Sequence, residues 1–525
     1  MELLKLQRDT VAFNAAIGAC RRRGAWDVAV ALLSKMTEVR TFKDIIAYNA
    51  AISVCAKSKH WEVAVKFFSG LRESGLIPDV ITYNASINCC GSGSRWEAAI
   101  AFVDDMIQAK TKMDTVTFNS AISACEKGQQ WMLAMCFFWM MDAVRVIRNV
   151  VSYNSAISAC EKGAQWTKAL LLLSCMKTNS IPRDTITCSA IITACGKGEQ
   201  WMLALSFLST MKDERVSRNT ITQNAAISAC EKAGEWEVAL ALLKDMADEK
   251  IALNTITYNA AISACENGHQ WNWALRLLKI MASNGVEKTT ITYNTSISAC
   301  EKGNRWEMAL QLFADMEHAK VLKNTVTYNT AISACEKGAQ TKIALALLSD
   351  MGTHSVVRDS VTYSAGITAC LRGLAWNEAE SLWRQMRDEW IRPNRITFAA
   401  MMSVCEATQK GLEAVRLLQE MRHDMVLPDV IAYSAAVSAC ALNPQQWILA
   451  LQLLKDMQSD ELEPDLIMYN ALIGAFGKGK QWVIAVSLFH QLHVVALEPT
   501  PVTYRALVTA CERGQRRADA LNFAR

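Results

Sequence analysis

Hydrophobic positions recur along the chain with a period of about 35 residues. Within residues 255–289, Tyr258, Ile262 and Cys265 follow the i, i+4, i+7 spacing that places side chains on one face of an α-helix. The same pattern returns from Thr10 onward to the end of the sequence. A helical pattern that repeats at a fixed period predicts one repeat array rather than several independent globular domains.

A second helical pattern follows the first within each period. Trp306, Ala309, Phe313 and Met316 are spaced i, i+3, i+7, i+10, and Gly268 or its equivalent marks the turn between the two patterns. Five periods close with a proline, which stops the second helix: Pro78, Pro393, Pro428, Pro464 and Pro499. Each period therefore predicts a two-helix hairpin.

The sequence predicts an all-α solenoid of stacked 35-residue hairpins with a concave groove. Residues 10–500 contain fourteen full repeats, after a lead-in at residues 1–9. Residues 501–525 form a partial fifteenth repeat, which we expect to be truncated. The repeat that starts at Val430 carries one extra residue near Asn443 and Pro444.

Two apolar stripes and one cysteine stripe run through the repeats. Trp begins the second helix in 12 of the 14 full repeats, and Met or Leu closes it, which indicates core packing rather than a cofactor site. Fourteen of the 18 cysteines share one repeat position, from Cys20 to Cys511. Stacked helices lie about 10 Å apart, beyond the roughly 7 Å that a disulfide spans. We therefore expect reduced, buried thiols, no metal site and no cofactor.

Charge and hydropathy add little to this prediction. The net charge is +4, so any basic surface depends on how the charges are arranged. The longest apolar run, Trp131 to Met141, is shorter than the ~20 residues that a membrane-spanning helix needs, so we expect no membrane insertion. The N-terminus shows neither a signal peptide nor a transit peptide.

The repeats resemble the pentatricopeptide repeat. The resemblance rests on V/I-T-Y-N near the start of each repeat, Ala early in the second helix, Met near its end and a closing P-D. It covers residues 10 to 525. The W-x-x-L-G-x-x-Y text of the tetratricopeptide repeat is absent. The resemblance implies a right-handed superhelical α-solenoid that binds single-stranded RNA as a monomer, in a mitochondrion or plastid.

The fifth residue of each repeat carries part of the RNA chemistry that the resemblance implies. Asn is a poor helix former, so helix stability alone does not explain its recurrence there, and a capping or turn role is the alternative. The residues are Asn14, Asn49, Asn84, Asn119, Asn154, Ser189, Asn224, Asn259, Asn294, Asn329, Ser364, Ala399, Ser434 and Asn470.

The last residue of each repeat is the second part of this chemistry. It precedes the next helix, where Asp, Asn and Thr are also favoured as N-caps, and the two roles are compatible. The residues are Asp44, Asp79, Asp114, Asn149, Asp184, Asn219, Asn254, Thr289, Asn324, Asp359, Asn394, Asp429, Asp465 and Thr500.

Two further positions recur. The second residue is Val or Ile in all fifteen repeats, from Val11 to Val502, and the resemblance implies that these side chains sandwich each base; ordinary packing of the first turn is the alternative. Lys or Arg ends the first helix in 11 repeats, which stacking would align into a basic stripe along the groove. A favourable helix dipole explains these cations equally well.

The resemblance implies that each repeat reads one base with its fifth and last residues. Asn at the fifth position goes with pyrimidines and Ser with purines; Asp at the last position favours U or G, and Asn favours C or A. The resemblance also implies that the RNA runs 5′ to 3′ along the chain, which gives U-U-U-Y-U-A-Y-Y-Y-U-A-N-G-Y. The repeat with Ala399 is left open, and the partial repeat, with Arg505 at the fifth position, reads nothing.

Three classes of function compete. A sequence-specific RNA-binding protein would recruit other proteins or block access in organellar RNA processing, stabilisation, editing, splicing or translation. A protein-binding scaffold of tetratricopeptide type would carry variable groove residues instead of a recurring Asn and Asp/Asn pair. An enzyme is not expected, because the sequence has no phosphate loop, no nucleophile–base set and no H-x-E…C-x-x-C zinc signature.

Overall fold

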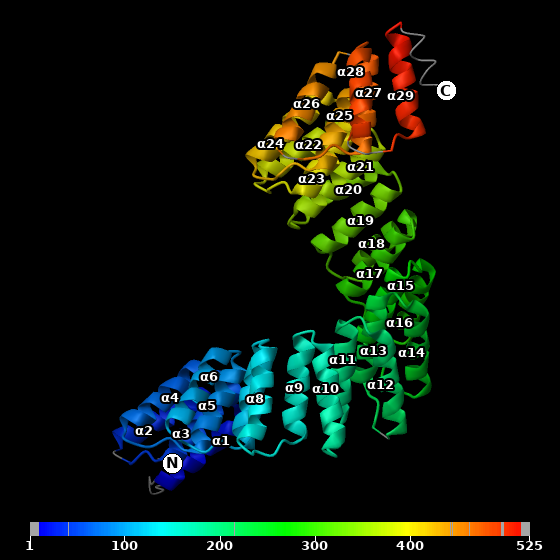
Figure 1. Ribbon diagram of the computed structural model, residues 1–525. Coiled ribbons are helices and arrows are strands. Elements are labelled where there is room, and N and C mark those ends of the chain that lie inside the picture. Colours follow the sequence, from blue (N-terminus) through cyan, green and yellow to red (C-terminus); the bar gives the residue numbers. More distant parts are fainter. Residues whose placement is uncertain are drawn as a thin grey trace. The chain divides into compact units, whose positions relative to one another are not determined.

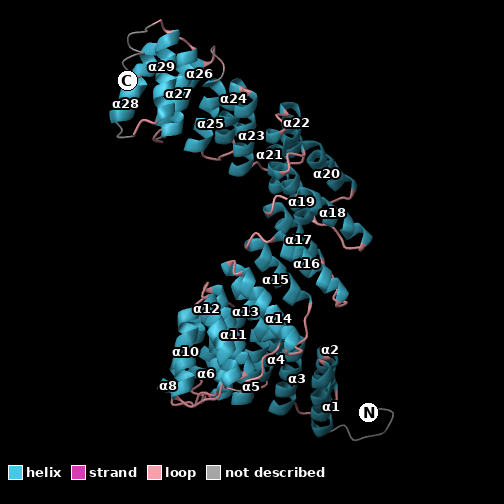
Figure 2. Ribbon diagram, turned by 90° about the vertical axis from the view of Figure 1, so that its right-hand side faces the viewer, coloured by secondary structure: helices cyan, strands magenta, loops and turns pink. Residues whose placement is uncertain are grey.

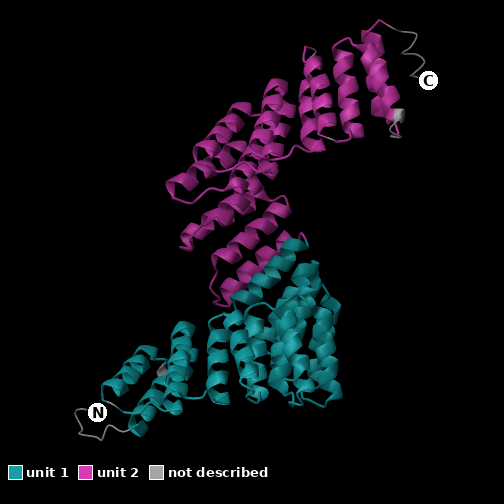
Figure 3. Cartoon of the chain, turned by 60° about the vertical axis from the view of Figure 1, so that its left-hand side comes forward, with its two compact units in different colours: residues 1–268 teal, residues 269–525 magenta. Residues whose placement is uncertain are grey.

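The computed structural model describes residues 10–39, 41–214, 216–441, 443, 445–460, 462–494 and 498–515. Over these ranges the chain forms twenty-nine helices and no strand (Figure 2). It divides into two compact units, residues 1–268 and 269–525, which are described separately (Figure 3). The predicted lead-in at residues 1–9 lies outside the described residues, as do residues 516–525 and Leu442 and Pro444 beside the predicted extra residue.

The first unit holds fifteen of the helices found in the described residues (Figure 1). They are α1 (Thr10–Arg23), α2 (Trp26–Glu38), α3 (Ile45–Ser58), α4 (Trp61–Glu73), α5 (Val80–Ser92), α6 (Trp96–Gln108), α7 (Thr115–Lys127), α8 (Trp131–Ala143), α9 (Val150–Lys162), α10 (Trp166–Thr178), α11 (Thr185–Lys197), α12 (Trp201–Asp213), α13 (Thr220–Ala233), α14 (Trp236–Asp248) and α15 (Thr255–Asn267).

The second unit continues the same alternation of helices. They are α16 (Trp271–Ser283), α17 (Thr290–Lys302), α18 (Trp306–His318), α19 (Thr325–Lys337), α20 (Thr341–Thr353), α21 (Ser360–Arg372), α22 (Trp376–Asp388), α23 (Arg395–Thr408), α24 (Gly411–His423), α25 (Val430–Ala441), α26 (Trp447–Ser459), α27 (Leu466–Lys478), α28 (Trp482–Val494) and α29 (Pro501–Arg513).

Each first helix begins directly after the last residue of the preceding repeat, which caps it. The Asp79 side chain accepts the backbone N–H of Thr82 at 2.8 Å, and the Thr82 hydroxyl faces the Asp79 N–H in return, forming a capping box. The same box starts α7, α9, α11 and α13. The N-cap role that we considered for the last residue is therefore confirmed.

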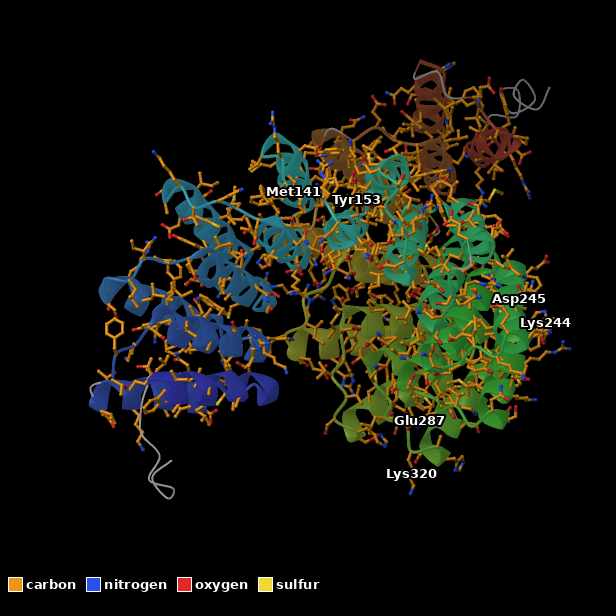
Figure 4. All side chains as sticks on the ribbon, turned by 90° about the horizontal axis from the view of Figure 1, so that it is seen from below. Met141, Tyr153, Lys244, Asp245, Glu287 and Lys320 are labelled. Carbon is orange, nitrogen blue, oxygen red and sulfur yellow. The ribbon has the colours of Figure 1, made fainter. Side chains whose placement is uncertain are left out.

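The hairpins stack so that first helices pack side by side. Helix α5 packs against α7 and α7 against α9, and the second helix α6 covers both α5 and α7. The predicted apolar face forms the core: Tyr258, Ile262 and Cys265 are fully buried. Figure 4 shows Met141 and Tyr153 among the helices, whereas Lys244 and Asp245 project from α14 at the surface. The predicted all-α solenoid of two-helix repeats is thus confirmed within each unit.

The glycine between the two helices has a different role from the predicted one. Gly128 has a φ of −79°, which any residue adopts, and the left-handed residue of the turn is Gln129, at φ 58°. A Cβ atom on Gly128 would lie 2.4 Å from Trp96 Cδ1 of the preceding repeat. Gly163 meets Trp131 in the same way. The glycine is therefore required by the half-buried tryptophan that packs on it, not by the turn.

The repeated cysteines behave as the sequence predicted. From Cys55 to Cys511 they are buried, free thiols, and only Cys20 of that stripe is partly exposed. Burial raises the pKa of the Cys300 thiol to about 11, so it stays protonated at neutral pH. These thiols therefore pack as small apolar groups in the core.

Candidate nucleic-acid interface

The fifth and last residues of a repeat, 30 positions apart in the sequence, meet side chain to side chain. Asn49 Nδ2 donates a hydrogen bond to Asp79 Oδ1 at 3.2 Å, because stacking places the N-cap of the next first helix beside the middle of the present one. The equivalent pairs are Asn14–Asp44 (3.0 Å), Asn84–Asp114 (3.2 Å), Asn119–Asn149 (3.3 Å), Asn154–Asp184 (3.1 Å), Asn224–Asn254 (3.5 Å), Asn294–Asn324 (3.3 Å) and Asn329–Asp359 (3.2 Å).

A third side chain, from the next repeat, fixes the orientation of the fifth-residue amide. The Thr82 hydroxyl donates to Asn49 Oδ1 at 2.6 Å, and Ser152 donates to Asn119 Oδ1 at 2.6 Å. The same bond joins Thr187 to Asn154, Thr257 to Asn224, Thr327 to Asn294, Thr362 to Asn329 and Thr503 to Asn470. No role for this hydroxyl was predicted from the sequence. It belongs to the third residue of each repeat, which was noted there only as the Thr of the V/I-T-Y-N motif.

The capping bonds decide which atom of the last residue stays available. Oδ1 of Asp79 accepts from the Thr82 N–H and from Asn49, and it lies 2.8 Å from the Thr82 hydroxyl oxygen. Burial alone would raise the pKa of Asp79, and the hydrogen bonds from Thr82 and Asn49 outweigh it, so the pKa lies below its usual range. The carboxylate is thus ionised, and its second oxygen retains acceptor capacity.

Asn at the last position presents the opposite chemistry. Oδ1 of Asn149 accepts from the Ser152 N–H at 3.0 Å and from Asn119 at 3.3 Å, and it lies 3.0 Å from the Ser152 hydroxyl oxygen. With the oxygen held by the cap, the amide NH2 is the group that remains. An Asp and an Asn at the same cap therefore differ in polarity, one offering an acceptor and the other donors.

Serine at the fifth position is held differently. The hydroxyls of Ser364 and Ser434 are buried and donate to carbonyl oxygens of their own helices, those of Ser360 and Val430, at 2.7 Å. Asn394 Nδ2 donates to the Ser360 hydroxyl at 3.2 Å. The Thr397 hydroxyl lies 2.9 Å from both Ser364 Oγ and Asn394 Oδ1, so it links the two predicted residues of this repeat.

The remaining predicted pairs fall into two groups. In the repeat with Ala399, the fifth residue has no amide to bond Asp429. Arg395 Nε donates to Asp429 Oδ2 at 3.0 Å instead. Among the described residues, no hydrogen bond joins the other predicted pairs within a unit, which are Ser189–Asn219, Ser434–Asp465 and Asn470–Thr500. Asn259 belongs to the first unit and Thr289 to the second.

The second residue of every repeat is exposed. All fifteen side chains, all Val or Ile, are more than half exposed to solvent. Their exposed fractions run from 53% at Val326 to 73% at Val11. Buried packing of the first turn, the alternative explanation for these residues, does not fit such exposure. Because the second and fifth residues are three apart on a helix, the apolar side chains and the asparagines share one face.

The cations at the end of the first helix form ion pairs that the sequence analysis missed. Lys162 Nζ lies 3.0 Å from Glu126 Oε1, Lys197 lies 3.0 Å from Glu161, and Lys337 lies 3.2 Å from Glu301. Each glutamate is the twelfth residue of the preceding repeat, one position before that repeat's own cation. The predicted basic stripe is therefore, in these repeats, a ladder of alternating charges.

Other kinds of site find little support in the described part of the chain. No three side chains among its His, Cys, Asp and Glu residues come together to hold a metal ion. None of its helices combines the length and the apolar character needed to cross a membrane. The exposed aliphatic side chains recur in all fifteen repeats, and an asparagine stands at the fifth position in ten of the fourteen full repeats.

Comparison with known families identifies these repeats. Models described as the PPR repeat family match residues 43–92, 78–127, 218–267, 288–337 and 323–372. A pentatricopeptide repeat domain model matches residues 171–233, 416–479 and 452–514, and a PPR repeat model matches residues 11–40, 151–181 and 256–286. No match was found among curated protein sequences.

Solved structures show the same fold. The crystal structure of the pentatricopeptide repeat protein PPR10 from maize aligns with a TM-score of 0.67 at 19% identity, covering 99% of this chain and 78% of that one. PPR10 in complex with an 18-nt psaJ RNA element aligns with a TM-score of 0.52 at 21% identity, covering 98% of this chain and 84% of that one. Together with the family models that match most of its length, these likenesses show that the chain belongs to the pentatricopeptide repeat family.

Proposed function

We propose that this protein binds single-stranded RNA in a sequence-specific manner, with one base at each repeat. The observation that carries the proposal is the hydrogen-bonded pair of fifth and last residues, repeated eight times beside exposed Val and Ile side chains. Membership of the pentatricopeptide repeat family and the RNA-bound state of its structural neighbour PPR10 support it.

The chemistry of a pair suits a pyrimidine. An Asn side chain has two N–H donors; Asn49 spends one on Asp79, so the other can serve a base carbonyl oxygen. The ionised Asp79 offers an oxygen to the ring N–H of uracil. Asn149, whose oxygen is held by the cap, offers its NH2 to the ring nitrogen of cytosine. The capping hydrogen bonds would thus decide whether the last residue offers an acceptor, which suits U, or a donor, which suits C.

The aliphatic side chains supply the affinity that hydrogen bonds do not. Val and Ile at the second position of consecutive repeats would sandwich each base. Stacking on aromatic side chains is worth about 1–3 kcal/mol per base, and an aliphatic clamp gives less. Many weak contacts in series then add up to tight binding of a matched sequence.

The proposed ligand is the pyrimidine-rich sequence U-U-U-Y-U-A-Y-Y-Y-U-A-N-G-Y. The protein would act without catalysis, as a monomer that protects a transcript or recruits RNA-processing proteins, in a mitochondrion or plastid. Because Ser364 and Ser434 are turned toward their own helices, we expect their repeats to tolerate base changes more readily than the Asn repeats.

Fluorescence anisotropy with the labelled 14-mer UUUCUACCCUAAGC tests the proposal. Controls are a scrambled 14-mer, the complement and the DNA version. Tight binding to the 14-mer, lost on scrambling, is the expected result. Equal weak binding to every oligonucleotide would indicate a generic basic groove. Absence of binding to any of them would favour a protein-binding scaffold and reduce the paired residues to caps.

A further inference from the structure

The helix face that carries the fifth residues changes its charge along the first unit. The second, fifth, ninth and twelfth residues of a first helix are spaced by three and four, so they line one face. In the first repeat the twelfth residue is Arg21, in the next two it is Ala56 and Gly91, and from the fourth repeat onward glutamates such as Glu126 appear there. The first three repeats therefore lack the acid that most later repeats carry; the exceptions among the later repeats are Gly196, Leu371, Ala441 and Gly477.

In the later repeats this glutamate is the centre of a three-residue contact. Glu126 Oε1 accepts from the Ser158 hydroxyl at 2.9 Å and lies 3.0 Å from Lys162 Nζ, both in the next repeat. In the second unit Glu301 makes the same contacts, at 2.9 Å to Ser333 and 3.2 Å to Lys337. The glutamate side chains are only 15–17% exposed, so the ion pairs are partly shielded from solvent.

Arg21 occupies the place of the glutamate in the same arrangement. The partners of Glu126 lie 32 and 36 positions later, and the residues 32 and 36 positions after Arg21 are again Ser53 and Lys57. Arg21, Ser53, Lys57 and Asn88 line one hollow of the first unit (α1, α3 and α5 in Figure 1). With Arg in the place of Glu, the hollow is lined by a guanidinium, an ammonium, a hydroxyl and an amide.

We propose that this hollow anchors a phosphate of the bound RNA, whereas Glu126, Glu161 and Glu301 hold their lysines away from the RNA backbone. The inference rests on the proposed function and deepens it. A guanidinium donates two parallel N–H bonds to phosphate oxygens, and the Ser53 hydroxyl and Lys57 ammonium add donors beside it. The first repeats would thus fix the RNA backbone, and the repeats with the ladder would depend on base contacts.

The salt dependence of RNA binding tests this assignment. For single strands the slope of log K against log salt changes by about 0.7 for each phosphate contact. Arg21→Gln removes one cation and should make the slope shallower by about 0.7. Arg21→Glu puts an acid at the position of Glu126 and should make the slope shallower by at least as much as Arg21→Gln. The full-length chain and the 14-mer above are used, and circular dichroism checks folding.

The opposite change provides a matched control. Glu161→Gln and Glu301→Gln release Lys197 and Lys337 and should each steepen the slope by about 0.7 without moving the base preference. RNAs with a 5′-hydroxyl and a 5′-phosphate separate the two sources of phosphate. If Arg21→Gln makes the salt slope shallower only for the 5′-phosphorylated RNA, Arg21 binds the terminal phosphate. If the slope changes equally for both RNAs, Arg21 binds a phosphodiester.

The result that would overturn the inference is distinct from failure of the proposed function. If the 14-mer binds selectively but Arg21→Glu, Arg21→Gln and the wild type share one slope, the phosphate site is wrong and base reading stands. If the variants change the slope while scrambled RNA binds as well as the 14-mer, the phosphate site stands and base reading is wrong.

Discussion

At the scale of single residues, the side chain at the end of a repeat caps a helix, and we propose that the same side chain selects a base. The cap bonds of Asp79 converge on one oxygen, so the second oxygen is presented in a fixed direction. Replacing the carboxylate by an amide keeps the cap and inverts the polarity of what is presented, as Asn149 shows. In the function that we propose, capping and base selection therefore use different atoms of the same group.

The depressed pKa of Asp79 gives a pH-dependent contribution to stability. A carboxyl whose pKa is lower in the folded state stabilises the fold above its unfolded pKa of about 3.9, and this contribution is lost as pH falls through the folded value. We expect wild type to exceed Asp79→Asn in unfolding free energy by about 0.5–1 kcal/mol at pH 6, the scale of an anion at a helix N-terminus.

Thermal unfolding of the two proteins between pH 6 and pH 2.5 measures this difference. The gap between wild type and Asp79→Asn should close toward the acid end. A gap that is constant with pH would show that the charge of Asp79 does not stabilise the cap, and would contradict the assignment.

At the scale of the helical elements, the repeat period predicted both helices of each hairpin and the positions of their caps. The apolar spacing of Tyr258, Ile262 and Cys265 was sufficient for the first helix, because burial of one face determines its register. The sequence did not predict which residues meet between repeats. Asn49 contacts Asp79 only because the repeats stack. The contact between Glu126 and Lys162 likewise joins two repeats, so the residue types at either position alone do not predict it.

The glycine at the end of the first helix shows why such pairing matters. Its place beside a turn suggested a conformational role, yet Gly303 has a φ of −82° and a Cβ there would lie 2.4 Å from Trp271 Cδ1. We expect Gly303→Ala to destabilise the protein by about 1–3 kcal/mol, the cost of overpacking. Chemical denaturation measures the change.

A glycine in open surroundings is the matched control. A Cβ on Gly474, within α27, has no neighbour within 4 Å, so Gly474→Ala should leave stability unchanged or raise it by up to ~1 kcal/mol, as in other helix interiors. Trp271→Ala should relieve the effect of Gly303→Ala in the double variant. Equal destabilisation by Gly303→Ala and Gly474→Ala would show that the tryptophan contact does not matter.

At the scale of the whole molecule, the array is modular, since within each unit the hairpins contact their neighbours through equivalent positions. Residues 115–149 form one complete repeat, and their removal joins Asp114 to Val150, which preserves an N-cap before a first helix. We expect this deletion to leave a folded protein that prefers the 14-mer without its fourth base.

Competition between the 13-mer and the 14-mer checks the register. The deletion variant should favour UUUUACCCUAAGC, whereas wild type should favour the 14-mer. A variant that binds both RNAs with the wild-type preference would show that bases are not assigned to repeats in order.

The most direct test of the central claim, that each repeat reads one base through its fifth and last residues, is a two-by-two exchange at the second repeat. Wild type and Asp79→Asn are each titrated with the 14-mer carrying U or C at its second base. The account predicts that wild type prefers U and that Asp79→Asn prefers C, each by about 1 kcal/mol, the worth of a hydrogen bond. If both proteins show the same preference between U and C, the reading of bases by the capped residue is contradicted.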